Sequence, residues 1–276
     1  MVRSFTLPIF VQAMLDNVVG FGRFSRFAGA ACWWALTGPK SFGRIRLLTP
    51  QLYAIGTKSI PVVMLVGGFV GAVLGIEMYA QLAAISQETR LGGIINVSVV
   101  KQIGPVLAAV MIAGRVGGAV AAELGTMRVT EQIDALRVMG TDPIAYLVVP
   151  RVIACVFMVP ILTIFSDVLG VLGGWLVVVQ AFGVNPTDYW QFSANFVNNW
   201  DLATGLVKSV FFGFAIGMIS CYKGFNAQGG SQGVGQAATD SFVTSFIVII
   251  VSNFFLAKFL NDLYSMFFGF TPTAFG

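Results

Sequence analysis

The feature that most constrains this chain is a series of apolar stretches long enough to cross a lipid bilayer. Residues 59–76 carry no charged side chain, and a helix needs about 20 mostly apolar residues to span the hydrocarbon core. This stretch continues to residue 84, and similar ones follow at 91–122, 152–182, 202–222 and 241–268. Helices keep all their backbone hydrogen bonds within one segment, as a lipid environment requires. The sequence therefore predicts an all-α, polytopic integral membrane protein with about five transmembrane helices.

The overall composition excludes several classes of function. Only 10% of the residues are charged and 57% are hydrophobic, whereas a soluble domain has about 25% charged residues. The chain has a net charge of +4, but its basic residues flank the apolar stretches and form no single basic stripe, so we expect no nucleic acid partner. It also contains no histidine, which removes the commonest general base and an important metal ligand. We therefore predict no catalytic residues and no metal site.

The positions of lysine and arginine predict the orientation in the membrane. Seven basic residues precede the first span, Arg128, Arg137 and Arg151 lie between the second and third, and Lys223 follows the fourth. The alternate loops hold only Arg90. Because basic loops stay on the cytoplasmic side, the N-terminus is predicted to be cytoplasmic and the C-terminus to lie on the opposite side.

Two segments outside the spans have the composition of surface helices. Residues 9–35 mix Phe, Trp and Met with Arg23 and Arg26, as in a helix that lies in the membrane interface. We therefore divide the chain into an N-terminal interfacial and cytoplasmic region, residues 1–58, and a transmembrane domain, residues 59–276. Asn185 and Pro186 begin a polar segment between the third and fourth spans, which predicts a short helix on the outer surface.

Small residues recur at every fourth position of the first two spans. Gly67, Gly71 and Gly75 form such a stripe in the first span. The same spacing recurs in the second span, at Gly114, Gly118 and Ala122. Such stripes let two helix backbones approach closely. Packing within the chain is the favoured interpretation, and the seam of a homodimer is the alternative.

Proline and ionisable residues inside the spans need a physical explanation. Gly104-Pro105 should kink the second span, because proline cannot donate a backbone hydrogen bond. Lys101 and Lys208 should lie near the outer side, where their long side chains can reach the interface. Asp167 is the deepest carboxylate, and a charged group at such depth needs a partner. A structural pair is the favoured interpretation for Asp167, with a role in the transport path as the alternative.

Residues 123–143, between the second and third spans, predict a short amphipathic cytoplasmic helix. Apolar residues recur at helical spacing at Val129, Ile133, Leu136 and Gly140. Charged residues fall elsewhere on the helical wheel, at Arg128, Glu131, Asp134 and Arg137. Gly140 with Asp142-Pro143 is a strong stop signal. Such a helix either rests on lipid or offers its charges and an apolar ridge to a cytoplasmic partner.

The glycine-rich residues 229–235 predict a flexible cytoplasmic turn before the last span. The chain contains no GxxxxGK[ST] pattern, which is the phosphate-binding loop of ATPases. We therefore expect the chain not to be an enzyme by itself. Any ATP would be bound by a separate subunit.

Two segments resemble a known family. Residues 104–143, GPVLAAVMIAGRVGGAVAAELGTMRVTEQIDALRVMGTDP, and residues 223–242, KGFNAQGGSQGVGQAATDSF, are similar to the MlaE/YrbE permeases of ABC transporters associated with MCE proteins. The resemblance implies a homodimeric permease in a bacterial inner membrane, with cytoplasmic ATPase subunits, a periplasmic MCE-domain protein and a small STAS-type accessory subunit. It would move phospholipids or related lipids between the inner membrane and the outer envelope. A secondary transporter or channel is the alternative.

The resemblance also assigns roles to individual residues. The family's coupling helix corresponds to about residues 124–141, and its contacts with the ATPase would fall on Met127, Arg128, Glu131, Ile133, Asp134, Leu136, Arg137 and Met139. A lipid pocket between two copies would be lined by Leu74, Glu77, Met78, Gln81, Leu82, Ile85 and Gln102. Some family members carry Arg-Glu before the Leu-Gly-Pro of the second span, where this chain has Lys101 and Gln102 before Ile103. The missing carboxylate leaves the preferred lipid head group open.

Overall fold

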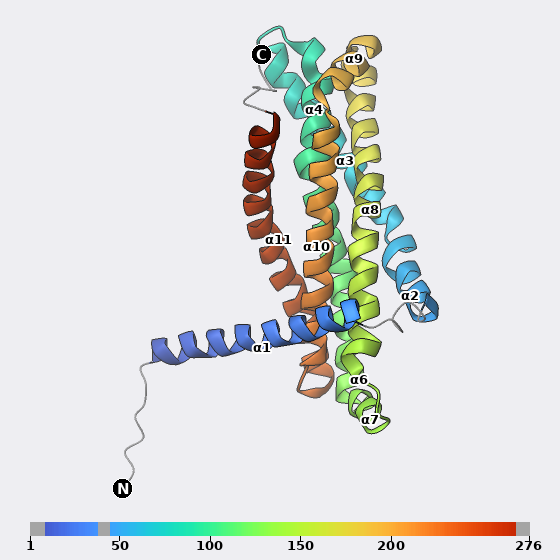
Figure 1. The fold of residues 1–276 in the computed structure, drawn as a ribbon. Helices are drawn as coiled ribbons and strands as arrows, with labels where there is room; N and C mark the ends of the chain where they lie inside the picture. The colour runs from blue at the N-terminus through green and yellow to red at the C-terminus, as the bar shows by residue number, and fades with distance from the viewer. Residues whose placement is uncertain (1–8, 38–44, 269–276) are drawn as a thin grey trace.

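The computed structural model describes residues 9–37 and 45–268, and all regular elements in this part of the chain are helical (Figure 1). Five helical segments are long and apolar enough to cross a membrane: Leu47–Ala83, Glu88–Val129, Ile144–Ala181, Asn199–Phe225 and Gly230–Phe267. They stand side by side as one bundle (Figure 1). The predicted all-α fold with five spans is therefore confirmed.

The first three spans are built from several consecutive helical elements. The first contains α2 (Ile45–Leu52), η2 (Tyr53–Thr57) and α3 (Ile60–Ala83). The second contains η3 (Glu88–Arg90), α4 (Leu91–Ser98), η4 (Val99–Ile103), α5 (Gly104–Ile112), η5 (Ala113–Gly117) and α6 (Gly118–Val129). The third contains η6 (Ile144–Val148), α8 (Val149–Trp175) and η7 (Leu176–Ala181). All of these η elements except the 3₁₀ turn η3 are π-helical, and π turns often occur at functional sites.

The fourth and fifth spans are single helices, α10 (Asn199–Phe225) and α11 (Gly230–Phe268). Gly229 and Gly230 both have positive φ, +92° and +67°, so glycine makes the tight connection between the two helices. The predicted flexible turn at 229–235 is therefore wrong for its later part. Helix α11 begins eleven residues before the predicted residue 241, because an apolar stretch marks only the apolar part of a helix and residues 230–240 are largely polar.

The glycine stripe of the first span packs against α8 of the same chain. A Cβ on Gly67 would stand 2.7 Å from the Ser166 Oγ, and one on Gly71 would stand 2.8 Å from the Gly170 Cα. Real Cβ atoms essentially never come so close, so α3 and α8 approach at a distance that only glycine allows. The interpretation of this stripe as packing within the chain is confirmed.

The second glycine stripe lies against α11. A Cβ on Gly114 would stand 3.4 Å from the Phe242 ring, and one on Gly118 would stand 3.9 Å from the Ala238 carbonyl oxygen. These are looser contacts than those between α3 and α8. Both glycine stripes are therefore occupied by helices of the same chain.

Two surface helices mark opposite ends of the bundle (Figure 1). Helix α1 (Ile9–Thr37) crosses one end at a steep angle to the spans and extends beyond them, as expected of an interfacial helix. Its Phe27 ring contacts the Tyr222 ring, with centroids 5.4 Å apart. Helix α9 (Pro186–Phe196) lies at the other end, and Asn185 caps it by accepting a hydrogen bond from the Thr187 N–H at 2.9 Å. The predicted helices at both positions are confirmed.

Candidate functional site

The segment predicted as a coupling helix forms two helical pieces. Helix α6 continues from the second span to Val129, and α7 covers Gln132–Val138. Glu131 separates them with a left-handed φ of +59°, and Gly140 follows α7 with a φ of +71°. The single helix expected over about 124–141 is therefore wrong. Helix α7 lies at the tip of the bundle, on the same end as α1 (Figure 1).

The middle of the predicted apolar ridge, Ile133 and Leu136, faces the bundle, whereas Val129 and Gly140 are exposed. Ile133 is completely buried, and Leu136 is half-buried against the hydrophobic core. These two side chains hold α7 in place, and Ile133 has no surface left for a partner. The expectation that the ridge enters a partner's groove is therefore wrong for Ile133, because periodicity identifies an apolar face without showing what covers it. For Leu136 it stays a prediction.

The exposed face of α7 carries other residues. Val138 is 89% exposed and Met139 is 69% exposed, and Glu131 is also exposed. Val138 and Met139 are adjacent, and exposed apolar side chains that lie together often mark a surface that binds a partner. The family resemblance assigned an ATPase contact to Glu131 and Met139, but not to Val138.

The charged residues of this segment bind one another. Asp134 accepts hydrogen bonds from Arg128 at 2.7 Å and from Arg137 at 2.8 Å. Both arginines therefore converge on one carboxylate that joins the end of α6 to α7. Nearby, Arg151 at the start of α8 forms an ion pair with Glu123 at 2.8 Å. These pairs fix the tip of the bundle to the ends of two spans.

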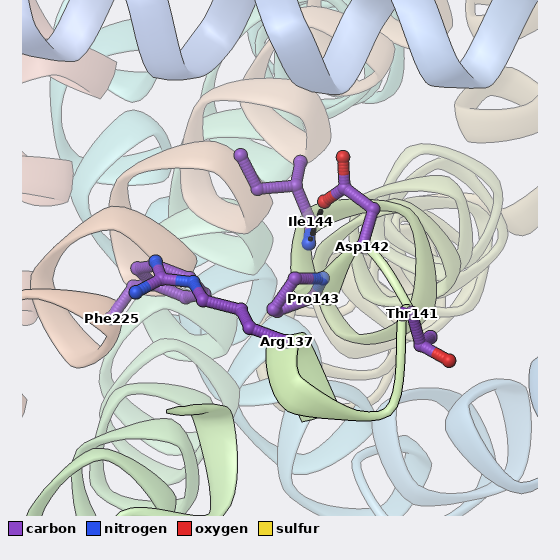
Figure 2. Close-up of a pocket in the computed structure, with 7 residues that line it drawn as sticks. Arg137, Thr141, Asp142, Pro143, Ile144 and Phe225 are labelled. Carbon is purple, nitrogen blue, oxygen red and sulfur yellow. Dashed lines mark hydrogen bonds between the residues drawn. The ribbon is translucent and has the colours of Figure 1, made fainter. Parts of the chain in front are cut away.

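A cavity of about 390 Å³ lies beside α7 (Figure 2). The Arg137 guanidinium lies 5.8 Å from the centre of the Phe225 ring, within the range of a cation–π contact. On the other side, Asp142 accepts hydrogen bonds from the Ile144 N–H at 2.8 Å and from the Trp34 indole N–H at 2.9 Å. The wall of this cavity therefore runs from α7 to the end of α10, and Asp142 connects it to α1.

The residues expected to bind lipid fall into three groups at the α9 end. Leu82 is buried, and Leu74 and Met78 pack against the same cluster. The exposed side chains of the set are Glu77, Gln81 and Ile85. Gln102, on η4, is half-buried and hydrogen-bonded to Lys208. The structure therefore brings Glu77 and Gln81 to an exposed face of α3, with Ile85 just beyond its end, and it places Gln102 in a separate polar cluster.

This polar cluster joins the second and fourth spans. Lys101 forms an ion pair with Asp201 at 2.9 Å. Lys208 is only 1% exposed and donates a hydrogen bond to the Lys101 carbonyl oxygen at 3.2 Å. That carbonyl lies four residues before Pro105, which has no N–H to offer it. The expectation that Lys208 reaches the interface is wrong, because its ammonium instead satisfies polar groups at the proline break.

A second buried polar network joins α4 to α9. The Asn96 side-chain amide donates a hydrogen bond to the Ser193 Oγ at 2.6 Å and accepts one from the Tyr189 hydroxyl at 3.0 Å. Burial raises the pKa of Tyr189 to about 12, although the hydrogen bond to Asn96 acts in the opposite direction. Tyr189 is therefore a neutral donor at physiological pH.

Tyr189→Phe is expected to loosen α9 from the bundle. The change leaves the buried Asn96 carbonyl without its donor, and an unsatisfied buried acceptor costs about 1–3 kcal/mol. The purified protein should therefore unfold at a lower temperature, as measured by the loss of monodisperse protein on heating. Exposed Tyr53→Phe is the matched control and should leave the unfolding temperature unchanged, since Tyr53 is 58% exposed. Equal stability of the two variants would contradict a stabilising hydrogen bond between Tyr189 and Asn96.

Comparison with known proteins assigns this arrangement to a family. The sequence profile of the family described as Permease MlaE matches residues 48–259. The chain belongs to the MlaE permease family. The match includes all five spans in large part, the tip with α7, and both polar networks at the α9 end. It favours a permease, a membrane-crossing component that is not itself catalytic, over the alternative of a secondary transporter or channel.

Several permeases are similar to the chain over most of its length. A probable ABC transporter permease protein of Rickettsia felis is 42% identical over 237 residues, which covers 86% of this chain and 90% of the relative. One from Synechocystis is 44% identical over 85% of this chain and 88% of its own length. The intermembrane phospholipid transport system permease protein MlaE of Haemophilus influenzae is 34% identical over 91% of this chain and 97% of its own length.

Proposed function

We propose that this chain is the permease subunit of an ABC transporter that moves phospholipids or related lipids between the inner membrane and the outer envelope of a bacterium. The observation that carries this proposal is the similarity to the Haemophilus phospholipid transport permease over 97% of that protein. The five spans and the absence of a recognisable ATP-binding loop in the sequence support a division of labour, in which separate subunits bind ATP.

The tip around α7 is the surface proposed for the ATPase. It projects beyond the spans (Figure 1), and exposed Val138 and Met139 can enter a groove of a partner. Of the residues that the family resemblance assigned to this contact, Ile133 and Leu136 support α7 from behind. The contact itself then falls on the exposed or partly exposed members: Met127, Arg128, Glu131, Asp134, Arg137 and Met139.

The orientation follows from the same surface. If the ATPase binds α7, the α1 end is cytoplasmic, in agreement with the basic residues that flank it. The α9 end and the C-terminus then face the periplasm. There we place the MCE-domain protein, while a small STAS-type subunit would accompany the ATPase.

A homodimer would complete the lipid site. The exposed face of α3 carries Leu65, Phe69, Val73 and Ile76, with Glu77 among them. In a dimer this face and the neighbouring Gln81 and Ile85 would enclose a lipid together with their copies. Gln102 would act from the polar cluster with Lys208, so this cluster would contribute an amide and buried positive charge in place of a carboxylate.

Reconstitution of the transporter tests the proposal. The chain, purified with its ATPase and MCE-domain subunits and placed in vesicles, should transfer a fluorescent phospholipid to acceptor vesicles only when ATP is supplied. A version with a hydrolysis-deficient ATPase is the control and should transfer no more lipid than protein-free vesicles. Transfer by the chain alone without ATP, or none by the full assembly, would contradict the proposal.

A further inference from the structure

A cavity on the outside of the bundle contains a carboxyl group without a partner. The cavity has a volume of about 310 Å³ and lies between α8, α9 and α10. Apart from Asp167, its lining is aliphatic or aromatic, including Val168, Trp190, Leu202 and Leu206. Trp190 and Leu202 are more than 40% exposed, so the cavity opens toward the surroundings of the bundle.

Asp167 is fixed at this position by the fold. The side chain is 9% exposed, and its Oδ1 is buried with no hydrogen-bond partner in the described part of the chain. The same atom lies against Gly104 at the start of α5, where an added Cβ would come within 3.0 Å of the Asp167 Cγ and closer still to Oδ1. The absence of a side chain on Gly104 therefore makes room for the carboxyl group.

The structural pair expected for Asp167 does not form. The ion pairs of residues 9–37 and 45–268 within 4.0 Å include Lys101 with Asp201, but none involves Asp167. An ionised carboxylate without a cation is costly at membrane depth. A carboxyl group that keeps its proton avoids this cost and can donate a hydrogen bond.

The position of the Asp167 carboxyl along the bundle indicates which part of a lipid it could contact. Gly104 follows Lys101 by three residues, which places it about 4.5 Å further along the helix. Lys101 is ion-paired with Asp201 at the α9 end of the bundle. Asp167 therefore lies about one helical turn from this ion pair. If the pair lies among the lipid head groups, where charged side chains are stable, the carboxyl group reaches the level of the ester groups. Ester carbonyls accept hydrogen bonds and donate none, so they complement a protonated carboxyl group.

We propose that this cavity binds one acyl chain of a diacylglycerolipid from the leaflet on the α9 side. The Asp167 carboxyl would donate a hydrogen bond to an ester carbonyl of that lipid through Oδ2, because Oδ1 is buried against Gly104. The aliphatic walls accept the chain, and the Trp190 indole lies at the mouth, as tryptophan does at membrane interfaces. This site goes beyond the proposed function, because it lies on the α8 and α10 side and not on the exposed face of α3.

A second cavity offers an internal comparison. It has a volume of about 500 Å³ and lies between α10 and α11, lined by Phe211, Val251 and Phe255 among others. Its Ser252 hydroxyl already donates a hydrogen bond within α11, to the Val248 carbonyl oxygen. This surface should therefore accept any hydrocarbon chain without preference for the linkage.

The test uses two photoactivatable lipids with the same head group and chains, one a diester and the other a diether, in nanodiscs containing the full transporter without ATP. Mass spectrometry measures labelling at each cavity. We expect the diester to label the region of Leu202 and Leu206 about threefold to tenfold more than the diether, the preference that one net hydrogen bond gives. The two lipids should label Val251 and Phe255 equally.

Two variants connect the preference to one atom group. Asp167→Leu should make the two lipids equal at Leu202 and Leu206, whereas Asp167→Asn, whose amide still donates, should keep the preference. Equal labelling by both lipids in the unmodified chain, or a preference that survives Asp167→Leu, would overturn the proposal. Because labelling is read without ATP, failure of transport leaves this result intact, and loss of the preference leaves ATP-driven transport intact.

Discussion

Val138→Asp is expected to release the ATPase from the transporter while the permease stays folded. Val138 is 89% exposed at the end of α7, so aspartate there costs the free chain little. In the proposed complex the same carboxylate would be buried in an apolar contact, and an unpaired polar group costs about 1–3 kcal/mol in such a place. Each 1.4 kcal/mol is a factor of ten in affinity, so the affinity for the ATPase should fall by roughly fivefold to a hundredfold, and less ATPase should copurify.

Two further variants separate docking from folding. Thr187→Asp introduces the same charge at an exposed site of α9, at the opposite end of the bundle, and should leave recovery of the ATPase unchanged. Leu136→Asp places the charge where α7 packs against the core, so it should reduce the yield of folded permease itself. Normal ATPase recovery with Val138→Asp would show that the tip of α7 rests on lipid and docks no subunit.

Glu131→Lys adds no equally sharp test, because the left-handed φ of residue 131 makes any substitution there a change of backbone as well as charge. Asp134→Lys would also alter the fold of α7, for another reason. It would place a third cation beside Arg128 and Arg137, which now share the Asp134 carboxylate. Both changes would disturb α7 before they reached a partner.

The large features of this fold could be predicted because each depends on local sequence. The five spans follow from apolar stretches, and the helix that starts after Asn185 follows from its cap. The direction of the α7 ridge could not be predicted, since the same periodicity suits a face buried in the bundle and one buried in a partner. Ile133 is buried in the bundle, and its neighbours in the sequence do not indicate which surface covers it.

Contacts between residues far apart in the sequence could not be predicted either. Lys208 binds Gln102 and the carbonyl of Lys101, more than 100 positions away, and neither residue alone indicates the other. The π-helix before Gly104 and the missing donor of Pro105 create the acceptor that Lys208 satisfies. The sequence predicts the break at Pro105. It does not predict that Lys208 donates to the carbonyl that the break leaves free, because a long side chain near the end of a span can equally reach the interface.

Gly71→Ala is expected to destabilise the bundle, and Gly68→Ala in the same helix is not. A Cβ on residue 71 would stand 2.5 Å from the Gly170 carbonyl carbon of α8, whereas one on residue 68 would meet Leu169 at 3.6 Å, an ordinary contact. Both changes gain the same helix propensity, about 0.5–1 kcal/mol. Any difference between them therefore measures how closely α3 and α8 approach.

Overpacking a tight core costs about 1–3 kcal/mol, and here the obstructing atoms belong to a backbone that cannot rotate away. The Gly71→Ala protein should lose its monodisperse state in detergent at a clearly lower temperature than Gly68→Ala, which should match or slightly exceed the unmodified chain. Because the contact lies within one chain, the difference should persist when the ATPase is absent. If both variants were equally stable, α3 would not lie against α8 at the distance that its glycine stripe allows.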